Sequence, residues 1–475
     1  MFELKDLNYE IKKLNKRSAN GEDEIHNKMI QKTSQEFRKI ILYLINETVK
    51  QSKIPQQWKN SVICMIPKKQ KSTGNPKEYR PISLTSCVAK LAERLMLSKT
   101  KEFTEKNNII IKQQSGFRKQ RQTRDNLFFL TQKATESVNR GKKMITIFFD
   151  IASAFDKVWH QGLIFKLLKL NFPFHIICWI REFLIKRYFS VRVNNYLTRQ
   201  VLIETGVPQG AVFSPTLFSI FINDIPMNFS KNKFYSLLFA DDLCAFKIYK
   251  KSGKNVIKNV QCYLNSIEGW LKKWRLLMAP LKCNFIVFST DKRYDYDNEI
   301  DIKLFGTKIN SCESPVFLGI RFDKHLTFKN QLKYMKDSCI KRMNVLKVLS
   351  NKSWGLSSKT LTDIYKSLIR SLMEYSSIIY PCFSATNTAT LEKIQFKCLK
   401  IIHRKSKFES NNVIKSLPNY QEIVDRFDDL NINYLKNCMK NKNPIIEELF
   451  QDYEQYSKSR SLNKLTLFCK YRTRL

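Results

Sequence analysis

The sequence predicts an α+β fold, in which strand and helix patterns follow one another without strict alternation. Its 475 residues exceed the size at which a single core keeps growing, so we expect two or three subdomains. With 43% hydrophobic and 12% aromatic residues, the chain has ample material for packed cores. No apolar run reaches the roughly 18 residues of a membrane span, so we expect no membrane association.

Residues 1–60 predict helices, because apolar positions recur there every three or four residues. The short apolar run Ser61–Pro67 is typical of a strand, and a basic, turn-rich stretch follows it. Helical spacing returns from Thr85 to about Thr104. The chain is therefore expected to begin with a helical extension that leads into a first strand.

The middle of the chain supplies further strands. Lys142–Asp156 begins as a buried strand, and Phe189–Gly210 predicts a hairpin. The next helix is expected to have Ser214 as its N-cap and Pro215 at its first position. Another helix is expected from about Gly253 to Leu277, after which the chain becomes mostly helical and its last 70 residues are basic and less regular.

The formal net charge is +41, from 83 Lys and Arg against 42 Asp and Glu, and the excess extends over the whole length. Such an excess favours an extended polyanion, such as a nucleic acid, as partner, although a solvated basic surface is the simpler explanation. The 12 cysteines show no paired zinc spacing, and most lie in apolar runs. Because the N-terminus does not resemble a secretory signal, we expect reduced thiols and an intracellular protein.

Two adjacent aspartates, Asp241 and Asp242, lie between apolar stretches in the segment SLLFADDLCAF. Burial and mutual repulsion both disfavour two ionised neighbours unless a positive charge is close. A divalent cation such as Mg²⁺ removes this conflict, because it prefers carboxylate oxygens. A hairpin turn with two solvated aspartates explains the same segment, since Asp is common in turns.

A third carboxylate, Asp150, ends the apolar strand ITIFFDI. One acidic site at a strand end and another at a hairpin tip can meet on neighbouring strands. Three carboxylates could then hold two metal ions about 4 Å apart, which would activate a 3′-hydroxyl and stabilise a leaving pyrophosphate. Asp156 follows at the start of a helical pattern, where we expect a capping or structural role.

Seven motifs, taken in order, resemble the reverse transcriptases of non-long-terminal-repeat retrotransposons, with the jockey-like insect branch as the nearest match. They are YRPISLTS, QSGFRKQRQTRDNL, FFDIASAFDKVWH, GVPQGAVFSPTLFSIFIND, FADDLCAF, WRLLMAPLKC and FLGIRFDKHLTF. Any one motif alone is a weak signal, but seven at plausible spacing are specific. The resemblance covers about residues 1–405 and implies a right-hand polymerase fold with fingers, palm and thumb.

The resemblance also implies domain boundaries. They are a helical extension at 1–60, fingers and palm at 61–323, a helical thumb and post-thumb region at 324–405, and a basic C-terminal segment at 406–475.

By the same resemblance, Asp150, Asp241 and Asp242 match the catalytic triad that binds two Mg²⁺ ions, with Mn²⁺ as a possible substitute. Lys282 of PLKC matches a lysine proposed to protonate the leaving pyrophosphate. Phe155 matches a bulky residue that crowds a ribose 2′-hydroxyl and so favours dNTPs, although an ordinary core phenylalanine is the simpler explanation.

The remaining matches concern substrate binding. The residues expected to contact the nucleotide, besides Phe155, are Arg80, Lys68, Ile151, Gln209 and Gly210. A guanidinium suits the triphosphate, whereas a solvated basic loop explains Lys68 equally well. The residues expected to contact the template are Gly116, Phe117, Arg118 and Arg121, and those at the primer end are Leu318 and Gly319 of FLGI.

The resemblance implies an RNA-directed DNA polymerase that adds dNTPs to a DNA primer on an RNA template. No endonuclease domain precedes the first motif, so we expect nicking activity to be supplied elsewhere, and the family suggests a nuclear location. The main alternative is a catalytically inactive retroelement remnant that binds RNA, against which the intact triad argues. A two-metal nuclease, an RNA-templated RNA polymerase and a domesticated or intron-type relative are further alternatives.

Overall fold

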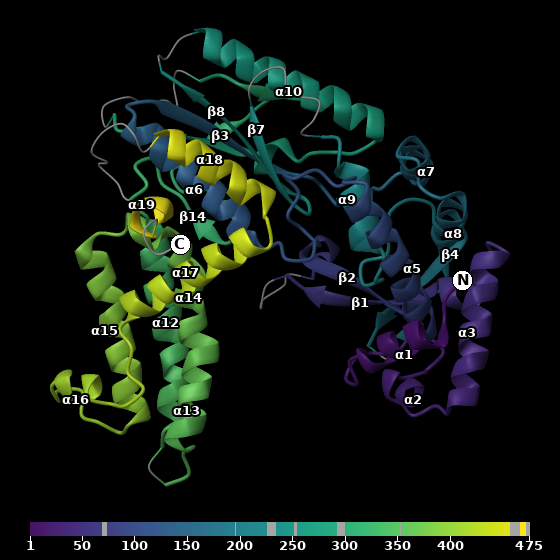
Figure 1. Cartoon of the computed structure of the whole chain (residues 1–475), viewed down its shortest axis with the longest axis horizontal. Helices are drawn as coiled ribbons and strands as arrows, with labels where there is room; N and C mark the ends of the chain where they lie inside the picture. The colour runs from purple at the N-terminus through teal and green to yellow at the C-terminus, as the bar shows by residue number, and fades with distance from the viewer. Residues whose placement is uncertain are drawn as a thin grey trace. The chain divides into compact units, whose positions relative to one another are not determined.

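A computed structural model gives the fold of the chain (Figure 1). The structure describes residues 1–68, 74–194, 196–225, 234–250, 254–291, 300–351, 353–456 and 466–471. Two compact units are built from interleaved segments of the chain. The first unit comprises Met1–Phe117, Ile151–Phe229 and Asn265–Ala279, and the second comprises Arg118–Asp150, Ser230–Leu264 and Pro280–Leu475.

The first unit begins with helices, as the apolar spacing predicts. They are α1 (Leu4–Lys12), α2 (Asn27–Gln31), α3 (Gln35–Lys50) and α4 (Gln56–Lys59). Helix α1 buries Leu7 and Ile11, and α3 buries Ile41 and Ile45, so each helix presents one apolar stripe to the core. The Ser34 hydroxyl accepts a hydrogen bond from the Phe37 amide and caps α3.

The sheet of the first unit has the strand order β2-β1-β4-β5, with β6 also paired to β4. Strand β1 pairs antiparallel with β2 and parallel with β4. The strands are β1 (Asn60–Pro67), β2 (Tyr79–Thr85), β4 (Arg187–Val193), β5 (Tyr196–Leu197) and β6 (Val201–Ile203). Within the described part of this unit, the sheet is accompanied by the α-helices α5 (Cys87–Lys106), α7 (His160–Lys169), α8 (Phe174–Leu184) and α9 (Ser214–Ile222).

Helix α9 differs from the sequence prediction at its first turn. Its N-cap is Phe213, so the expectation that Ser214 caps the helix is wrong. The buried carboxylate of Glu93 supplies the acceptor instead, since its Oε2 lies 2.6 Å from the Val212 amide nitrogen and 3.1 Å from that of Phe213. A distant carboxylate thus replaces the local cap, while Pro215 still lies in the first turn, where its missing N–H is tolerated.

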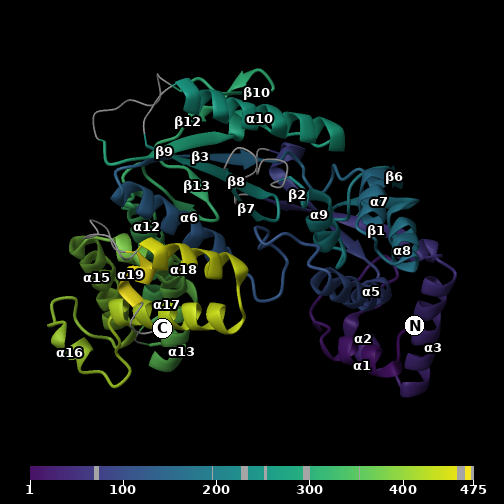
Figure 2. The ribbon, with the colours of Figure 1, turned by 45° about the horizontal axis from the view of Figure 1, so that its top comes forward.

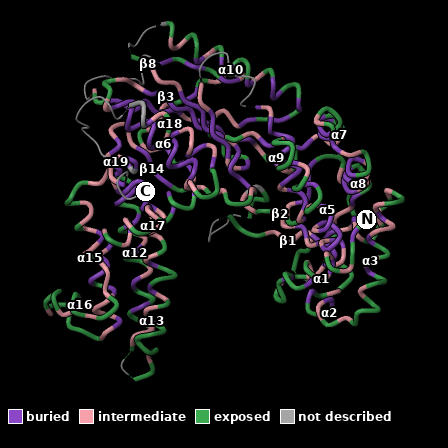
Figure 3. Tube along the Cα trace, viewed as in Figure 1, coloured by how far each residue is buried: buried purple, intermediate pink, exposed green. Residues whose placement is uncertain are grey.

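The second unit is built on a sheet with the strand order β12-β9-β3-β8-β7. The strands are β3 (Lys143–Asp150), β7 (Tyr235–Phe239), β8 (Asp242–Tyr249), β9 (Asn284–Phe288) and β12 (Asn310–Ser311). Strand β3 lies in the middle and is buried along most of its length (Figure 3). Helix α6 (Thr123–Asn139) packs against β3 and β7, and its Phe128 and Leu130 lie in the same core as Phe148 of β3.

Smaller elements complete this unit. Two short hairpins consist of β10 (Lys303–Leu304) with β11 (Thr307–Lys308), and β13 (Val316–Phe317) with β14 (Ile320–Arg321). Helices α12 (Lys329–Leu349), α13 (Ser358–Tyr365), α14 (Ser371–Tyr375) and α15 (Ala385–Ile402) follow and share a second core. Helix α10 (Lys254–Trp274) begins in the second unit and ends in the first.

The C-terminal part is more regular than its sequence suggests. It forms α16 (Asn412–Lys415), α17 (Ile423–Lys440), α18 (Pro444–Tyr456) and α19 (Leu467–Tyr471). Figures 1 and 2 show α18 beside α6, and residues of α17, α18 and α19 belong to the core that contains β3. Helix α17 has an apolar stripe that includes Phe427, Tyr434 and Leu435, so the expectation of low regularity is wrong here.

None of the helices in the described ranges is both long and apolar enough to cross a membrane.

Candidate active site

Asp150 and Asp242 lie opposite each other on neighbouring strands. Asp150 is the last residue of β3, Asp242 is the first of β8, and the antiparallel register pairs them directly. Directly opposed residues of an antiparallel pair point to the same face of the sheet, with Cβ atoms about 5 Å apart. The expected meeting of a strand end and a hairpin tip is therefore observed.

A tight turn delivers the second aspartate of the FADD segment. Phe239 of β7 pairs with Asp242 of β8, which leaves Ala240 and Asp241 as the turn. Ala240 has φ +58°, a left-handed conformation that costs an alanine about 1–2 kcal/mol. Asp241 thereby lies at the hairpin tip, directly before the strand that carries Asp242, so the turn and the acidic site are one feature.

The three carboxylates affect one another electrostatically. Partial burial, reinforced by Asp241 and Asp150, raises the pKa of Asp242 to about 6. Burial also raises the pKa of Asp241, with Asp150 adding to the effect. The ionised forms of Asp241 and Asp242 are therefore destabilised by burial and by neighbouring carboxylates, which is the condition that a hard cation with oxygen ligands relieves.

The donor set suits a divalent cation, although it is not preassembled. Among the described residues, no three His, Cys, Asp or Glu side chains form a group that could already hold a metal ion. The fit of Asp150, Asp241 and Asp242 to a metal thus rests on their oxygen chemistry, their strand register and their mutual repulsion.

Lys282 lies on the other side of Asp150. Strand β9 begins two residues later and pairs with β3, so β3 has β9 on one side and β8 on the other. The Lys282 ammonium nitrogen is 3.4 Å from Asp150 Oδ2, and its side chain is 69% exposed. An exposed ion pair of this kind adds little stability, so the ammonium group can move towards a ligand at small cost.

In the first unit, the GVPQG segment closes against strand β2. The Ser83 amide donates to the Gln209 carbonyl oxygen at 2.7 Å. Gly210 has φ +122°, and a Cβ atom at this position would lie 2.6 Å from the Ser83 carbonyl oxygen. Only glycine fits here without displacing the backbone.

Asp156 explains how Gln209 is held. The Gln209 side-chain amide donates to Asp156 Oδ1 at 2.8 Å. Asp156 therefore has a structural role, as expected, but its partner lies far along the chain and no local pattern indicates it.

Phe155 lies in an aromatic cluster. Its ring stacks on Phe218 with centroids 4.7 Å apart, and Phe117 meets it edge-on at 6.2 Å. These contacts fix the orientation of a half-buried ring. Ile151 is buried and forms a β-bridge with Met278, so its side chain belongs to the core and only its backbone remains for ligand contact.

Arg80 and Lys68, the two cationic residues predicted to contact the nucleotide, lie at one end of the β1–β2 pair. Arg80 pairs in register with Ile66 and its side chain is exposed. The Lys68 amide donates to the Glu78 carbonyl oxygen at 2.8 Å, directly after β1 ends.

The predicted template motif is divided between the two units. Gly116 and Phe117 belong to the first unit, and the Gly116 amide donates to the Gln114 side chain at 2.8 Å. Arg118 and Arg121 belong to the second unit, where the Arg121 guanidinium donates to Asn443 ahead of α18. Leu318 and Gly319 form the turn between β13 and β14, also in the second unit.

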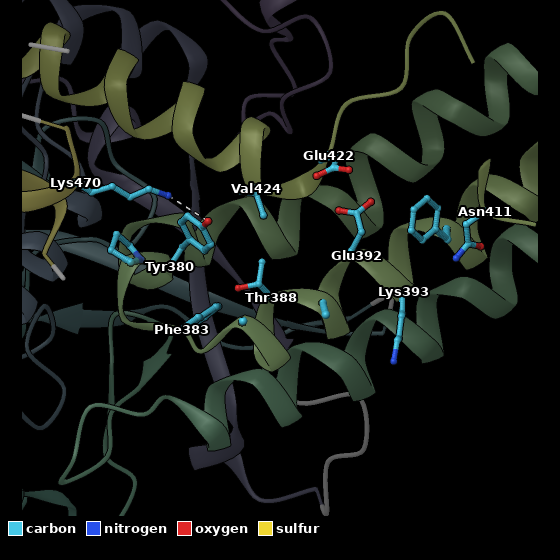
Figure 4. Close-up of a pocket in the computed structure, with 13 residues that line it drawn as sticks. Tyr380, Phe383, Thr388, Glu392, Lys393, Asn411, Glu422, Val424 and Lys470 are labelled. Carbon is cyan, nitrogen blue, oxygen red and sulfur yellow. Dashed lines mark hydrogen bonds between the residues drawn. The ribbon is translucent and has the colours of Figure 1, made fainter. Parts of the chain in front are cut away.

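The second unit also contains a cavity of about 600 Å³ that no sequence motif indicates (Figure 4). It lies where α15 meets the segment that enters α17, and Tyr380, Phe383 and Phe396 form part of its aromatic lining. Glu392 is engaged within the protein, because it accepts hydrogen bonds from the Tyr420 hydroxyl at 2.7 Å and the Ile423 amide at 2.8 Å.

Residues 66–322 match the family model described as reverse transcriptase (RNA-dependent DNA polymerase). The chain is 30% identical over 371 residues to the probable RNA-directed DNA polymerase from transposon BS of Drosophila melanogaster, covering 76% of this chain and 40% of that protein. It is 29% identical over 408 residues to the RNA-directed DNA polymerase from mobile element jockey of the same species, covering 84% of this chain and 43% of that protein. The chain thus spans about two fifths of the length of these curated relatives.

Among solved structures, telomerase from Candida Tropicalis in complex with a fragment of telomeric RNA aligns with a TM-score of 0.41 and 12% identity. The alignment covers 83% of this chain and 68% of that one.

Proposed function

Since this chain belongs to the reverse transcriptase family, we propose that it is an RNA-directed DNA polymerase of a non-long-terminal-repeat retrotransposon. In this proposal it adds dNTPs to the 3′ end of a DNA primer on an RNA template. The observation that carries the proposal is the register that sets Asp150 opposite Asp242, with Asp241 in the adjoining turn. A lone acidic turn would not need a third carboxylate on the neighbouring strand.

We propose that Asp150, Asp241 and Asp242 hold two divalent cations, Mg²⁺ or in its place Mn²⁺. When bound, such ions activate the primer 3′-hydroxyl and stabilise charge on the leaving pyrophosphate. The protein contributes carboxylate oxygens from two hydrogen-bonded strands, and these side chains would have to converge on the ions as they bind.

Lys282 is proposed to donate a proton from its ammonium group to the departing pyrophosphate. Its exposed side chain lies beside Asp150, one of the three proposed metal-binding aspartates. The ion pair with Asp150 holds the ammonium group close to the carboxylates.

The nucleotide-binding residues are proposed to act in the first unit. Arg80 and Lys68 supply cations for the triphosphate. The Gln209–Gly210 backbone, which is hydrogen-bonded to Ser83, is proposed to pack against the incoming base and the template. The ring of Phe155, which stacks on Phe218, is proposed to exclude a ribose 2′-hydroxyl. Ile151 contributes only backbone to this set.

The partners follow from charge and family. The +41 charge suits an RNA template and a DNA primer, with affinity that falls steeply as salt rises, because phosphate contacts release counterions. Template contacts are proposed for Gly116, Phe117, Arg118 and Arg121, and contacts with the primer end for Leu318 and Gly319. Strand nicking is proposed to be supplied elsewhere and the protein to act in the nucleus.

The test is primer extension on poly(rA)/oligo(dT) with Mg²⁺ and dTTP. Asp242→Asn removes one charge at the site and should abolish extension, whereas Asp301→Asn removes an exposed carboxylate outside it and should not. Extension that survives Asp242→Asn would refute the assignment. A folded wild-type protein that binds RNA in a salt-dependent way but extends no primer would instead be the inactive remnant.

A further inference from the structure

The β13–β14 hairpin contains an unfavourable turn. Phe317 pairs with Ile320, so Leu318 and Gly319 form a two-residue loop. Both have positive φ, +45° for Leu318 and +80° for Gly319, as in a type I′ turn. Glycine suits its position, but leucine in a left-handed conformation is strained and persists only if surrounding contacts hold it.

Tyr375, at the end of α14, makes those contacts. Its hydroxyl donates to the Leu318 carbonyl oxygen at 2.5 Å. Its ring also lies against the turn, since a Cβ atom built on Gly319 would be 3.4 Å from the Tyr375 ring. One side chain thus holds both turn residues.

The same hydroxyl joins the turn to α6. It lies 3.2 Å from the Thr123 hydroxyl, and Thr123 is the first residue of α6, shortly after the predicted template motif. A second contact fixes the other end of the hairpin. Gln331 of α12, which is 2% exposed, accepts from the Arg321 amide at 3.0 Å and donates to the Ser376 hydroxyl at 3.1 Å.

We propose that Tyr375 is a positioning residue for polymerisation, whose hydroxyl fixes the Leu318–Gly319 turn relative to the start of α6. This inference rests on the proposed function, in which the turn holds the primer end. A displaced turn would misplace the primer 3′-hydroxyl, and small misplacements of a reacting atom reduce the rate of the chemical step. Nucleotide and template binding involve other residues and should change little.

The first test is Tyr375→Phe, which removes only the hydroxyl. We expect the kcat of single-nucleotide extension to fall about fivefold, in line with the loss of one hydrogen bond, with unchanged KM for dTTP and unchanged affinity for template RNA. The matched control is Tyr365→Phe, which removes a buried hydroxyl bonded to Gln395 Oε1 at 2.8 Å in the helical region and should retain wild-type kcat.

The second test is rescue. Asparagine tolerates the left-handed conformation that type I′ turns require, so Leu318→Asn should make the turn less dependent on Tyr375. We therefore expect the kcat of the double variant Leu318→Asn/Tyr375→Phe to lie close to the kcat of Leu318→Asn alone, so that the loss of the tyrosine hydroxyl costs little in this background. A purely structural role of Tyr375 in helix packing would not respond to the residue at position 318.

Amide hydrogen exchange of residues 316–322, measured in the folded full-length protein, reports the stability of the turn independently of polymerase activity. Exchange should be about fivefold faster in Tyr375→Phe and should return towards the wild-type rate in the double variant. Unchanged exchange and kcat in Tyr375→Phe would overturn the inference, as would failure of Tyr375→Phe to fold while Tyr365→Phe folds. If wild-type protein extends no primer, the proposed function fails, whereas the exchange data still decide whether Tyr375 holds the turn.

Discussion

Replacing Gly210 by alanine should damage the GVPQG segment more than any neighbouring substitution of equal size. At φ +122° an L-residue is strained, and the added Cβ atom would lie 2.6 Å from the Ser83 carbonyl oxygen. Because that oxygen belongs to the backbone of β2, it cannot rotate away. Relief requires the segment to move off β2, which breaks the 2.7 Å hydrogen bond between the Ser83 amide and the Gln209 carbonyl.

The expected loss of folding stability has two contributions, the strained backbone and the broken hydrogen bond. Strained backbone costs about 1–3 kcal/mol, and the lost hydrogen bond costs about 1 kcal/mol. For a unit of this size, each kcal/mol lowers the unfolding temperature by roughly 2–4 °C. Gly210→Ala should therefore unfold roughly 5–15 °C below the wild type. If the segment relaxes instead, stability should be retained while kcat/KM for dTTP falls by about tenfold or more.

The control is Gly269→Ala, within helix α10. A Cβ atom there meets nothing within 4 Å, so alanine should raise stability by about 0.5–1 kcal/mol through helix propensity. Thermal unfolding and steady-state extension of both variants, measured side by side, provide the comparison. Wild-type stability together with wild-type kcat/KM in Gly210→Ala would refute the steric argument.

Three further predictions concern separate parts of the chain. Phe155→Ala should raise incorporation of rNTPs relative to dNTPs by about tenfold or more, because the stacked ring no longer crowds the sugar; an unchanged ratio in competitive extension would exclude a gating role. Tyr434→Phe should lower stability by about 1–3 kcal/mol in thermal unfolding, since buried Asp125 loses a hydroxyl donor at 2.9 Å, and an unchanged unfolding temperature would contradict this. Mg²⁺ should raise the unfolding temperature of the wild type but not of Asp242→Asn, and equal shifts would place the ion elsewhere.

The sequence predicts that Asp150 and the FADD hairpin lie on neighbouring strands, because the relevant signals are local. An apolar strand that ends in Asp150 and a hairpin that contains Asp241 and Asp242 are both visible as short patterns. Adjacent antiparallel strands then bring these residues together with few alternatives. The helical extension before β1 was predictable for the same reason, since its apolar spacing is regular.

Long-range hydrogen bonds made by polar side chains could not be predicted in this way. Glu93 replaces the expected cap of α9, Asp156 holds Gln209, and Tyr375 holds Leu318. In each pair the two partners lie in different segments, so no periodicity or turn signal links them. The C-terminal helices were missed for a different reason, because charged and polar residues interrupt the apolar residues that they contribute to the core shared with α6.

The FADD hairpin departs from two local rules at one point. Alanine at φ +58° occupies a position where glycine or asparagine would be less strained. Like charges directly opposite each other across an antiparallel pair, as Asp150 and Asp242 are, destabilise the sheet. A stable fold alone gains nothing from either feature, whereas a polymerase gains carboxylate oxygens that a cation can share. Local conflicts that coincide in this way are typical of functional sites, and this coincidence supports the proposed metal-binding role of the two adjacent aspartates.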